Sequence, residues 1–272
     1  MRLKGRACWA RLGRLPVNRP ATNKNGALTS AIAITMWAVR VLVLAFLVMF
    51  AGCGGSDAEQ AQPTTSPTGT TSTTTAAVCG EEDAEPVMLT TEDGVDVDAL
   101  LVGEGEVGVV LGHQLRSDYC SWVPFARILA KRHVSALAIN FVSVSPDDDM
   151  VAGARELQRR GAERIILAGA SMGGTAALVA AAEIDAAGVA SLSGPREFGG
   201  LDALPSVRRL DIPALFLAAQ NDGSFARDAR TLYRATKSHD KALVLTTGFE
   251  HGTDLLQDPK VERALLDFIV GG

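Results

Sequence analysis

One serine lies between two glycines where an expected strand meets an expected helix. The segment from Arg164 to Ile184 reads RIILAGASMGGTAALVAAAEI, an apolar run followed by Gly-Ala-Ser-Met-Gly-Gly and an alanine-rich stretch. Gly-x-Ser-x-Gly is common by chance, but a strand before it and a helix after it form the context in which serine acts as a nucleophile. Ser171 is therefore a candidate nucleophile. The alternative is a packing turn, in which small residues bring a helix close to a sheet.

A serine nucleophile needs a general base, and the chain contains four histidines. His251 lies in GFEHGTDLL, between the last expected strand and the last expected helix, on the same side of the sheet as Ser171. The remaining histidines follow a strand (His113), end a helix (His133) or lie in a polar loop (His239). We predict that His251 is the base and interpret His113 as structural.

The base in turn needs a carboxylate that orients its ring. Asp222 lies in LFLAAQNDGSF, directly after an apolar strand and again at its carboxyl end. Asp254 is the alternative, but it follows His251 too closely in the chain to orient the ring easily. The predicted order is Ser171, then Asp222, then His251.

These side chains can meet only if strands and helices bring them to one edge of a sheet. Val87–Thr91 and Val95–Val102 flank Glu-Asp-Gly, which predicts a hairpin. Thereafter strands and helices alternate, which predicts a parallel sheet with reactive groups at the carboxyl ends of its strands. The further strands expected are Glu106–Gly112, Val134–Ile139, Arg164–Ala168, Val189–Leu192, Pro213–Ala219 and Ala242–Thr246, and the helices Cys120–Arg132, Asp148–Arg160, Met172–Ala182 and Pro259–Val270.

The motifs AGASMGG, LFLAAQND and GFEHG together resemble the three catalytic stations of the α/β-hydrolase family. The resemblance extends over residues 87–268. It implies the α/β-hydrolase fold, a mostly parallel sheet flanked by helices that opens with a hairpin. It also implies that Ser171, Asp222 and His251 take the roles of the family's catalytic triad.

Within the family, the chain resembles small lidless serine esterases and dienelactone-hydrolase-like proteins, because no long insert separates Leu192 from Pro213. Dienelactone hydrolases proper have a cysteine nucleophile where this chain has serine. The resemblance implies an oxyanion hole made by the backbone N–H groups of Met172 and Leu115. Many members have His-Gly before the second donor, whereas this chain has His-Gln.

The expected activity is hydrolysis of an ester or similar acyl bond of a small molecule, through an acyl-enzyme and without a cofactor. Two alternatives stay open: an inactive binding lipoprotein on the same fold, and an acyltransferase or perhydrolase with another acceptor. The run Asp147-Asp148-Asp149 could suggest a cation site. We interpret it as the acidic start of a helix and predict no metal.

The N-terminal segment is basic and the remainder of the chain is acidic. Residues 1–52 contain eight of the 26 Lys and Arg residues and no acid, which leaves 18 basic against 31 acidic residues in the remainder. An acidic mature protein is not expected to bind nucleic acid. A basic segment before an apolar run is typical of an export signal. Met36 would make a natural start, with residues 1–35 as a mis-assigned extension or a long basic region.

The apolar run of the signal, from Val41 to Ala51, is short for a membrane span. It ends in Phe-Ala-Gly-Cys, which resembles a bacterial lipobox and implies lipidation of Cys53. The alternative is a plain anchor or a cleaved signal with an incidental cysteine. The expected location is therefore the cell envelope, where an exported protein is held at the membrane by its lipid anchor.

Residues 53–85 are rich in Thr, Ser, Pro and Gly, and they are expected to form a disordered tether before one domain over 86–272. Cys79 and Cys120 are the cysteines left beside Cys53 and Cys8, the latter in the segment expected to be removed. In an exported protein this pair favours a disulfide, with two buried free thiols as the alternative. We expect the domain to be a monomer.

Overall fold

The structure is a computed structural model that describes residues 79–80 and 83–271. The expected signal segment 1–52, Cys53 and most of the expected tether lie outside these residues. Within them, no helix combines the length and the apolar character that crossing a membrane requires.

An eight-stranded sheet, in the order β1-β2-β4-β3-β5-β6-β9-β10, forms the centre of the molecule. Its strands are β1 (Ala84–Thr90), β2 (Asp96–Val102), β3 (Val107–Gly112), β4 (Val134–Ile139), β5 (Arg164–Ala170), β6 (Gly188–Leu192), β9 (Ala214–Ala219) and β10 (Lys241–Thr246). Strands β1 and β2 form an antiparallel hairpin, β2 pairs antiparallel with β4, and the remaining pairs in this sheet are parallel. The carboxyl ends of the parallel strands therefore lie along one edge.

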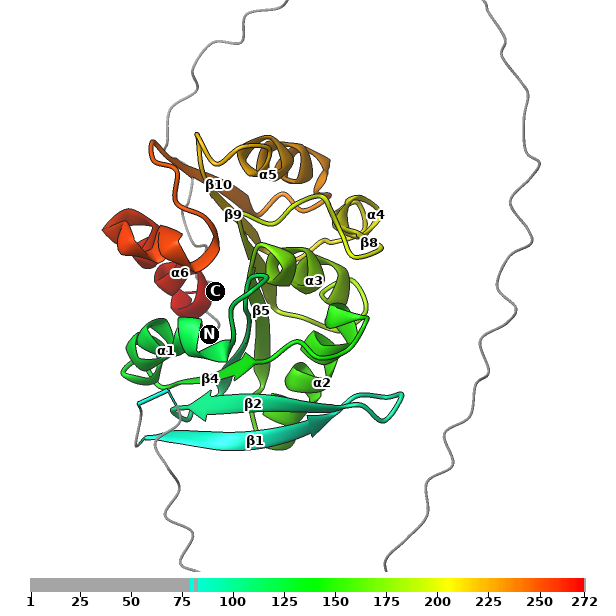
Figure 1. The fold of residues 1–272 in the computed structure, drawn as a ribbon, viewed down its shortest axis with the longest axis vertical. Helices are drawn as coiled ribbons and strands as arrows, with labels where there is room; N and C mark the ends of the chain where they lie inside the picture. Colours follow the sequence, from blue (N-terminus) through cyan, green and yellow to red (C-terminus); the bar gives the residue numbers. More distant parts are fainter. Residues whose placement is uncertain (1–78, 81–82, 272) are drawn as a thin grey trace, which may run out of the picture. The chain divides into compact units, whose positions relative to one another are not determined.

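Helices cover both faces of this sheet (Figure 1). They are α1 (Val123–Ala130), α2 (Pro146–Arg159), α3 (Met172–Ala180), α4 (Ala203–Val207), α5 (Phe225–Ala235) and α6 (Pro259–Gly271), with short 3-10 helices η1 (Tyr119–Trp122) and η2 (Gly252–Gln257). One hydrophobic cluster packs residues of α2 to α5 against one face, and a second packs α1 and α6 against the other. Because both faces are covered, central strands such as β3 and β4 are almost uniformly apolar and buried.

This architecture confirms the expected fold class, a mostly parallel sheet flanked by helices and opened by a hairpin. Three local features differ from the expectation. The first expected helix begins as η1 and becomes α-helical only at Val123, where Pro124 occupies its first turn. The segment between Leu192 and Pro213 holds a two-stranded ribbon, β7 (Glu197–Phe198) with β8 (Leu201–Asp202), and then α4. Helix α5 was not expected from the sequence.

A disulfide joins Cys79, ahead of β1, to Cys120 in η1, with 5.4 Å between their Cα atoms. Cys79 adopts a φ of 58°, in the left-handed region. The bond fastens the chain before the first strand to the segment between β3 and α1.

Candidate active site

The loops that follow the six parallel strands β3, β4, β5, β6, β9 and β10 lie at the carboxyl edge of the sheet. The strand register aligns the ends of neighbouring strands. Gly112 of β3 lies opposite Gly169 of β5, and Thr246 of β10 lies opposite Ala219 of β9. Ser171 follows β5, Asp222 follows β9 and His251 follows β10. The three predicted side chains thus lie on the same edge because their strands run in the same direction.

Ser171 forms the turn between β5 and α3, and its backbone is strained. Its φ of 50° and ψ of −115° are unusual for a residue with a side chain, and it is 7% exposed. Its N–H donates to Leu192 O at 2.8 Å, which ties the turn to β6. A Cβ at position 169 would lie 2.1 Å from Gly173 O, so glycine is needed there for the turn to close.

Backbone contact also joins the start of α3 to the end of β3. A Cβ on Gly173 would lie 2.3 Å from Gly112 O and 2.8 Å from His113 O, which leaves no room for a side chain. Met172 is the first residue of α3, so its N–H has no acceptor within the helix. The helix N-terminus beside Ser171 therefore offers a free donor and a positive dipole end.

His251 and Asp222 form a direct hydrogen bond. Nδ1 of His251 lies 2.8 Å from Oδ2 of Asp222, and the aspartate is 9% exposed. The ring of Phe225 packs on the imidazole with 4.3 Å between the ring centroids. Asn221 joins the two loops, because its N–H donates to Gly248 O and its Nδ2 donates to Thr247 O. The imidazole is therefore held by a residue of loop β9–α5, Asp222, and by the first residue of α5, Phe225.

Asp254, the alternative partner, is exposed, and its carboxylate accepts a bond from Gln257 at 3.4 Å. The structure thus brings Asp222, and not Asp254, to His251. Within the part of the chain that the structure describes, no hydrogen bond joins Ser171 to His251. Their loops are nevertheless in contact, since a Cβ on Gly252 would lie 3.4 Å from the Cβ of Ala170.

Leu115, the second expected oxyanion donor, lies in the loop after β3. Among the described residues, no acceptor is found for its N–H. The carbonyl of Gln114, the residue before it, accepts from Ser117 N at 3.1 Å and lies 2.8 Å from His113 Nδ1. The conformation of this turn is therefore fixed while the N–H of Leu115 stays available.

His113 is buried and bridges two loops. Phe141 N donates to its Nε2 at 3.1 Å, so Nε2 is unprotonated and Nδ1 carries the hydrogen that Gln114 O accepts. Burial lowers the pKa of His113, against the opposing effects of this hydrogen bond and of Asp118. A neutral, fully bonded imidazole is what a structural histidine requires.

Sequence analysis missed one polar contact at this edge. Oε1 of Gln114 accepts hydrogen bonds from Thr253 N at 2.8 Å and from Thr253 Oγ1 at 3.1 Å. The residues are 139 positions apart. The only available signal was the Gln in His-Gln, where many α/β-hydrolases have Gly.

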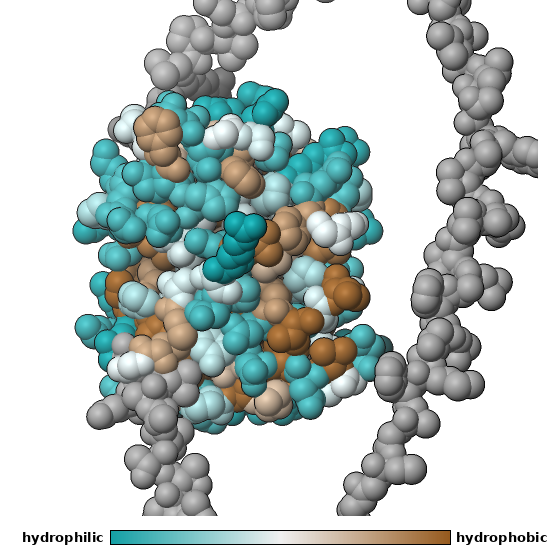
Figure 2. Space-filling view, in the orientation of Figure 1, coloured by the Kyte–Doolittle hydropathy of each residue, from teal (hydrophilic) through white to brown (hydrophobic). Residues whose placement is uncertain are grey.

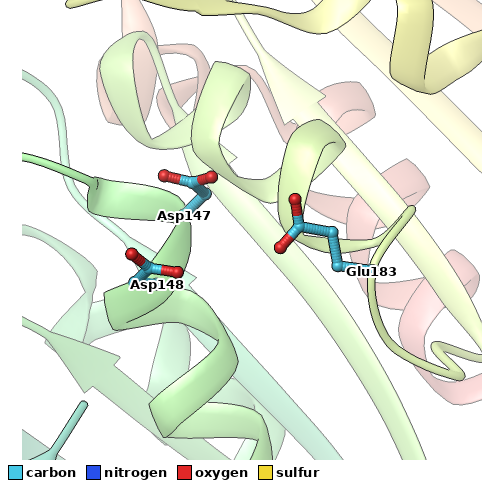
Figure 3. A group of neighbouring side chains, drawn as sticks. All are labelled: Asp147, Asp148 and Glu183. Carbon is cyan, nitrogen blue, oxygen red and sulfur yellow. The ribbon is translucent and has the colours of Figure 1, made fainter. Parts of the chain in front are cut away.

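The acidic run at the start of α2 lies close to Glu183, in the turn that follows α3. One carboxylate oxygen each from Asp147, Asp148 and Glu183 lies within 4.8 Å of the others (Figure 3). Burial raises the pKa of Asp147, and burial together with these two aspartates raises the pKa of Glu183. Asp147 and Asp148 lie in the first turn of α2, where free N–H groups and the helix dipole stabilise negative charge.

Several large apolar side chains are exposed in loops at the carboxyl edge. Leu115 is 57% exposed after β3, Val142 and Val144 are exposed after β4, and Phe249 is 76% exposed two residues before His251. Figure 2 shows apolar side chains gathered on one part of this face and polar ones over α5. Exposed apolar side chains therefore lie in three of the loops at the sheet edge that carries the residues predicted to react.

Comparison with known proteins rests on structure. A scan against protein-family models gives no match, and a search of curated protein sequences gives none either. Among solved structures, the chain is similar to an esterase domain from Rhodothermus marinus, with a TM-score of 0.57, 18% identity and coverage of 69% of this chain and 96% of the other.

Two other solved structures give similar agreement. A dienelactone hydrolase from Anabaena variabilis has a TM-score of 0.58 and 18% identity, covering 70% of this chain and 96% of the other. A monoacylglycerol lipase from Paleococcus ferrophilus has a TM-score of 0.55 and 17% identity, covering 65% and 99%. The strand order and helix placement of this chain, together with its similarity to these solved structures, show that it has the α/β-hydrolase fold.

Proposed function

We propose that this protein is a serine hydrolase that cleaves an ester or similar acyl bond through an acyl-enzyme. The observation that carries the proposal is the strained, buried Ser171 at the start of α3, on the same sheet edge as the hydrogen-bonded pair His251 and Asp222. Backbone strain of this kind occurs often at catalytic sites, where the surrounding structure holds a reactive residue in place.

In the proposed mechanism, His251 Nε2 takes the proton of Ser171 Oγ as the oxygen attacks the substrate carbonyl carbon. Asp222 Oδ2 accepts the hydrogen on Nδ1, which leaves Nε2 as the basic nitrogen and stabilises the imidazolium that forms. The proton then passes to the leaving alkoxide, and the acyl group stays on Ser171. Water, deprotonated by the same imidazole, attacks the acyl-enzyme and releases the acid.

Negative charge on the carbonyl oxygen is stabilised by two backbone donors, Met172 N–H and Leu115 N–H. The α3 N-terminus adds its dipole, and the turn before Leu115 is fixed by the bonds to Gln114 O. Preorganised donors of this kind are worth roughly 10²–10³-fold in rate for each N–H. No cofactor takes part in these steps.

The exposed apolar side chains around the site favour substrates with an apolar acyl or alkyl part. Leu115 and Phe249 lie in the two loops that carry the proposed second oxyanion donor and the base. The similar structures are an esterase domain, a dienelactone hydrolase and a monoacylglycerol lipase, which agrees with acyl chemistry.

The test is labelling with a fluorophosphonate, with mass spectrometry to locate the adduct, beside turnover of p-nitrophenyl acetate and butyrate. We expect one adduct on Ser171 and turnover of both esters. Ser171→Ala should lose about 10⁴-fold or more in turnover with an unchanged circular dichroism spectrum, since Ala meets the same backbone strain as Ser. Labelling elsewhere, or an active Ser171→Ala protein, would remove the assignment.

The same assays separate the alternatives. A folded protein without label or turnover would be an inactive binding protein on this fold. Labelling of Ser171 with slow hydrolysis, but with fast product formation in the presence of an alcohol or peroxide, would identify an acyltransferase or perhydrolase.

We also propose that the protein is exported and held at the cell envelope by lipid on Cys53, which lies outside the described residues. The support is the short apolar run that ends in Ala-Gly-Cys, and a remainder that is too acidic to bind anionic lipid by charge. Cys53→Ala should lose palmitate incorporation and processing at this position. A Cys53→Ala protein that is processed to the same size and enters the detergent phase of Triton X-114 would contradict lipid anchoring.

A further inference from the structure

We propose that Gln114 is a positioning residue that fastens the loop of the base to the turn of the oxyanion hole. The inference rests on the proposed function, because it assigns the purpose of a contact between two parts of that site. The contact itself is a pair of hydrogen bonds from Thr253 N and Thr253 Oγ1 to one oxygen, Gln114 Oε1.

His251 is the N-cap residue of η2. An N-cap side chain normally accepts a bond from one of the first free N–H groups of its helix. The imidazole of His251 makes no such bond, because its Nδ1 is engaged with Asp222. Thr253, the second residue of η2, would therefore keep a free N–H, and Gln114 supplies the missing acceptor from the other side of the site.

Gly252, between His251 and Thr253, lies directly against the glutamine. Its φ is +60°, and a Cβ at this position would lie 2.2 Å from Gln114 Oε1. The same Cβ would lie 3.4 Å from the Cβ of Ala170, the residue before Ser171. Glycine thus lets the base loop lie on both the glutamine and the end of the nucleophile strand.

The main chain of Gln114 is held as firmly as its side chain. Its carbonyl accepts the Nδ1–H of His113 and the N–H of Ser117, and His113 in turn is fixed by Phe141 N. The N–H of Leu115 follows this carbonyl in the chain, so its direction is set by the same bonds. One residue therefore fixes both the oxyanion donor, through its main chain, and the base loop, through its side chain.

This arrangement predicts an effect on rate and little effect on substrate binding. A shift of the imidazole by about 1 Å relative to Ser171 can cost roughly 10²-fold in rate, because proton transfer depends on the exact approach of the two atoms. The bonds of Gln114 to Thr253 do not involve the apolar side chains that flank the site. The two hydrogen bonds from Thr253 to Gln114 Oε1 are called the clamp below. Loss of the clamp should therefore lower kcat and leave KM nearly unchanged.

The experiment compares Gln114→Met, which keeps the length of the side chain but removes the acceptor, with Thr253→Val, which removes one donor. We expect kcat to fall about 10- to 100-fold for Gln114→Met and several-fold for Thr253→Val, with KM within about threefold. Thr253→Ser keeps both donors and should retain wild-type kcat. Gln257→Met is the matched control, since it removes a glutamine of η2 that does not reach the oxyanion turn.

A double variant distinguishes positioning from a general loss of stability. If both residues act through their shared bond, Thr253→Val should lower kcat little further in the Gln114→Met background. Kinetics are measured at a temperature at which circular dichroism shows every variant folded. Wild-type kcat in Gln114→Met, or additive effects in the double variant, would overturn the proposal.

Hydrogen exchange separates failure of the clamp from failure of the proposed function. In a Ser171→Ala background, which needs no turnover, Gln114→Met should speed exchange at the amide of Thr253 more than at the amides of α6. Unchanged protection at Thr253 would overturn the clamp. If the clamp is seen in exchange but wild-type protein neither binds fluorophosphonate nor hydrolyses ester, the proposed function fails and the positioning role fails with it.

Discussion

At the scale of single residues, burial separates the two aspartates that could partner His251. Asp222 is buried and bonded to Nδ1 of His251, whereas Asp254 is exposed and bonded to Gln257. A carboxylate can fix the tautomer of an imidazole only by accepting its Nδ1–H, so position after a strand is a better guide here than proximity in the chain.

Asp222→Asn should reduce kcat by up to about 10⁴-fold with little change in KM. The amide can donate to Nδ1, which would stabilise the tautomer whose Nε2 carries the hydrogen and cannot act as base. Steady-state kinetics on p-nitrophenyl butyrate measure both constants. Asp254→Asn is the control and should remain within about threefold of wild type; the reverse ranking of the two variants would reassign the third residue.

The sequence allowed Ser171, Asp222 and His251 to be named because each follows an apolar strand, and parallel strands end at the same edge. It did not allow the bonds of Gln114 to Thr253 to be foreseen. That contact joins two loops 139 residues apart. Its geometry depends on the packing of η2 against the end of β5, where a Cβ on Gly252 would lie 3.4 Å from the Cβ of Ala170. Side-chain contacts between loops have no period in the sequence from which they can be inferred.

At the scale of elements, the position of α3 depends on glycines that let main chain approach main chain. Gly173 lies against Gly112 and His113 of the β3 strand and its loop, and Gly174 lies against Ser191 and Gly194. These contacts set the distance between the N–H of Met172, on the helix, and the N–H of Leu115, on the loop.

Gly173→Ala should lower both stability and kcat, because its Cβ would overlap Gly112 O and push α3 away from β3. Overpacking of this kind costs about 1–3 kcal/mol, seen as a lower midpoint in urea unfolding. Gly271→Ala, in α6 with no atom within 4 Å of the added Cβ, is the control and should change neither quantity. Equal stability and equal kcat in Gly173→Ala would show that the contact does not position the donors.

Most elements were expected from the sequence, and those that were not have identifiable reasons. Helix α5 shows buried Ala226, Ala229 and Leu232 at helical spacing, but Arg and Asp between them obscured the pattern. Helix α4, at five residues, is too short to show a period. The 3-10 turn η1 is capped by Asp118, whose carboxylate accepts from Cys120 N, a local bond that favours a tighter turn than the expected α-helix.

At the scale of the whole molecule, the disulfide closes a loop between residues 41 positions apart, Cys79 and Cys120. In the chain-entropy description, closing such a loop restricts the unfolded chain and so stabilises the folded domain by about 4 kcal/mol. The loop contains the hairpin β1–β2, at one edge of the sheet, and β3, so the cross-linked segment extends from that edge to the strand beside β5.

Reduction should therefore lower the thermal midpoint of the domain by roughly 10 °C, measured by circular dichroism with and without dithiothreitol. A variant with both Cys79→Ser and Cys120→Ser should match the reduced wild-type protein and should not respond to reductant. A midpoint that is the same in both conditions for wild type would contradict a stabilising role for the bond.

The same disulfide determines where mechanical force would enter the domain. Strand β1 lies at one edge of the sheet and pairs with β2, and Cys79, just ahead of it, is where tension from the proposed lipid anchor at Cys53 would enter the domain. Without a cross-link, this tension would pull directly on β1 and could peel it from the sheet. With the bond, tension from the proposed anchor would pass to Cys120 and to η1, which packs beside β4, so that less of the load would fall on the hairpin.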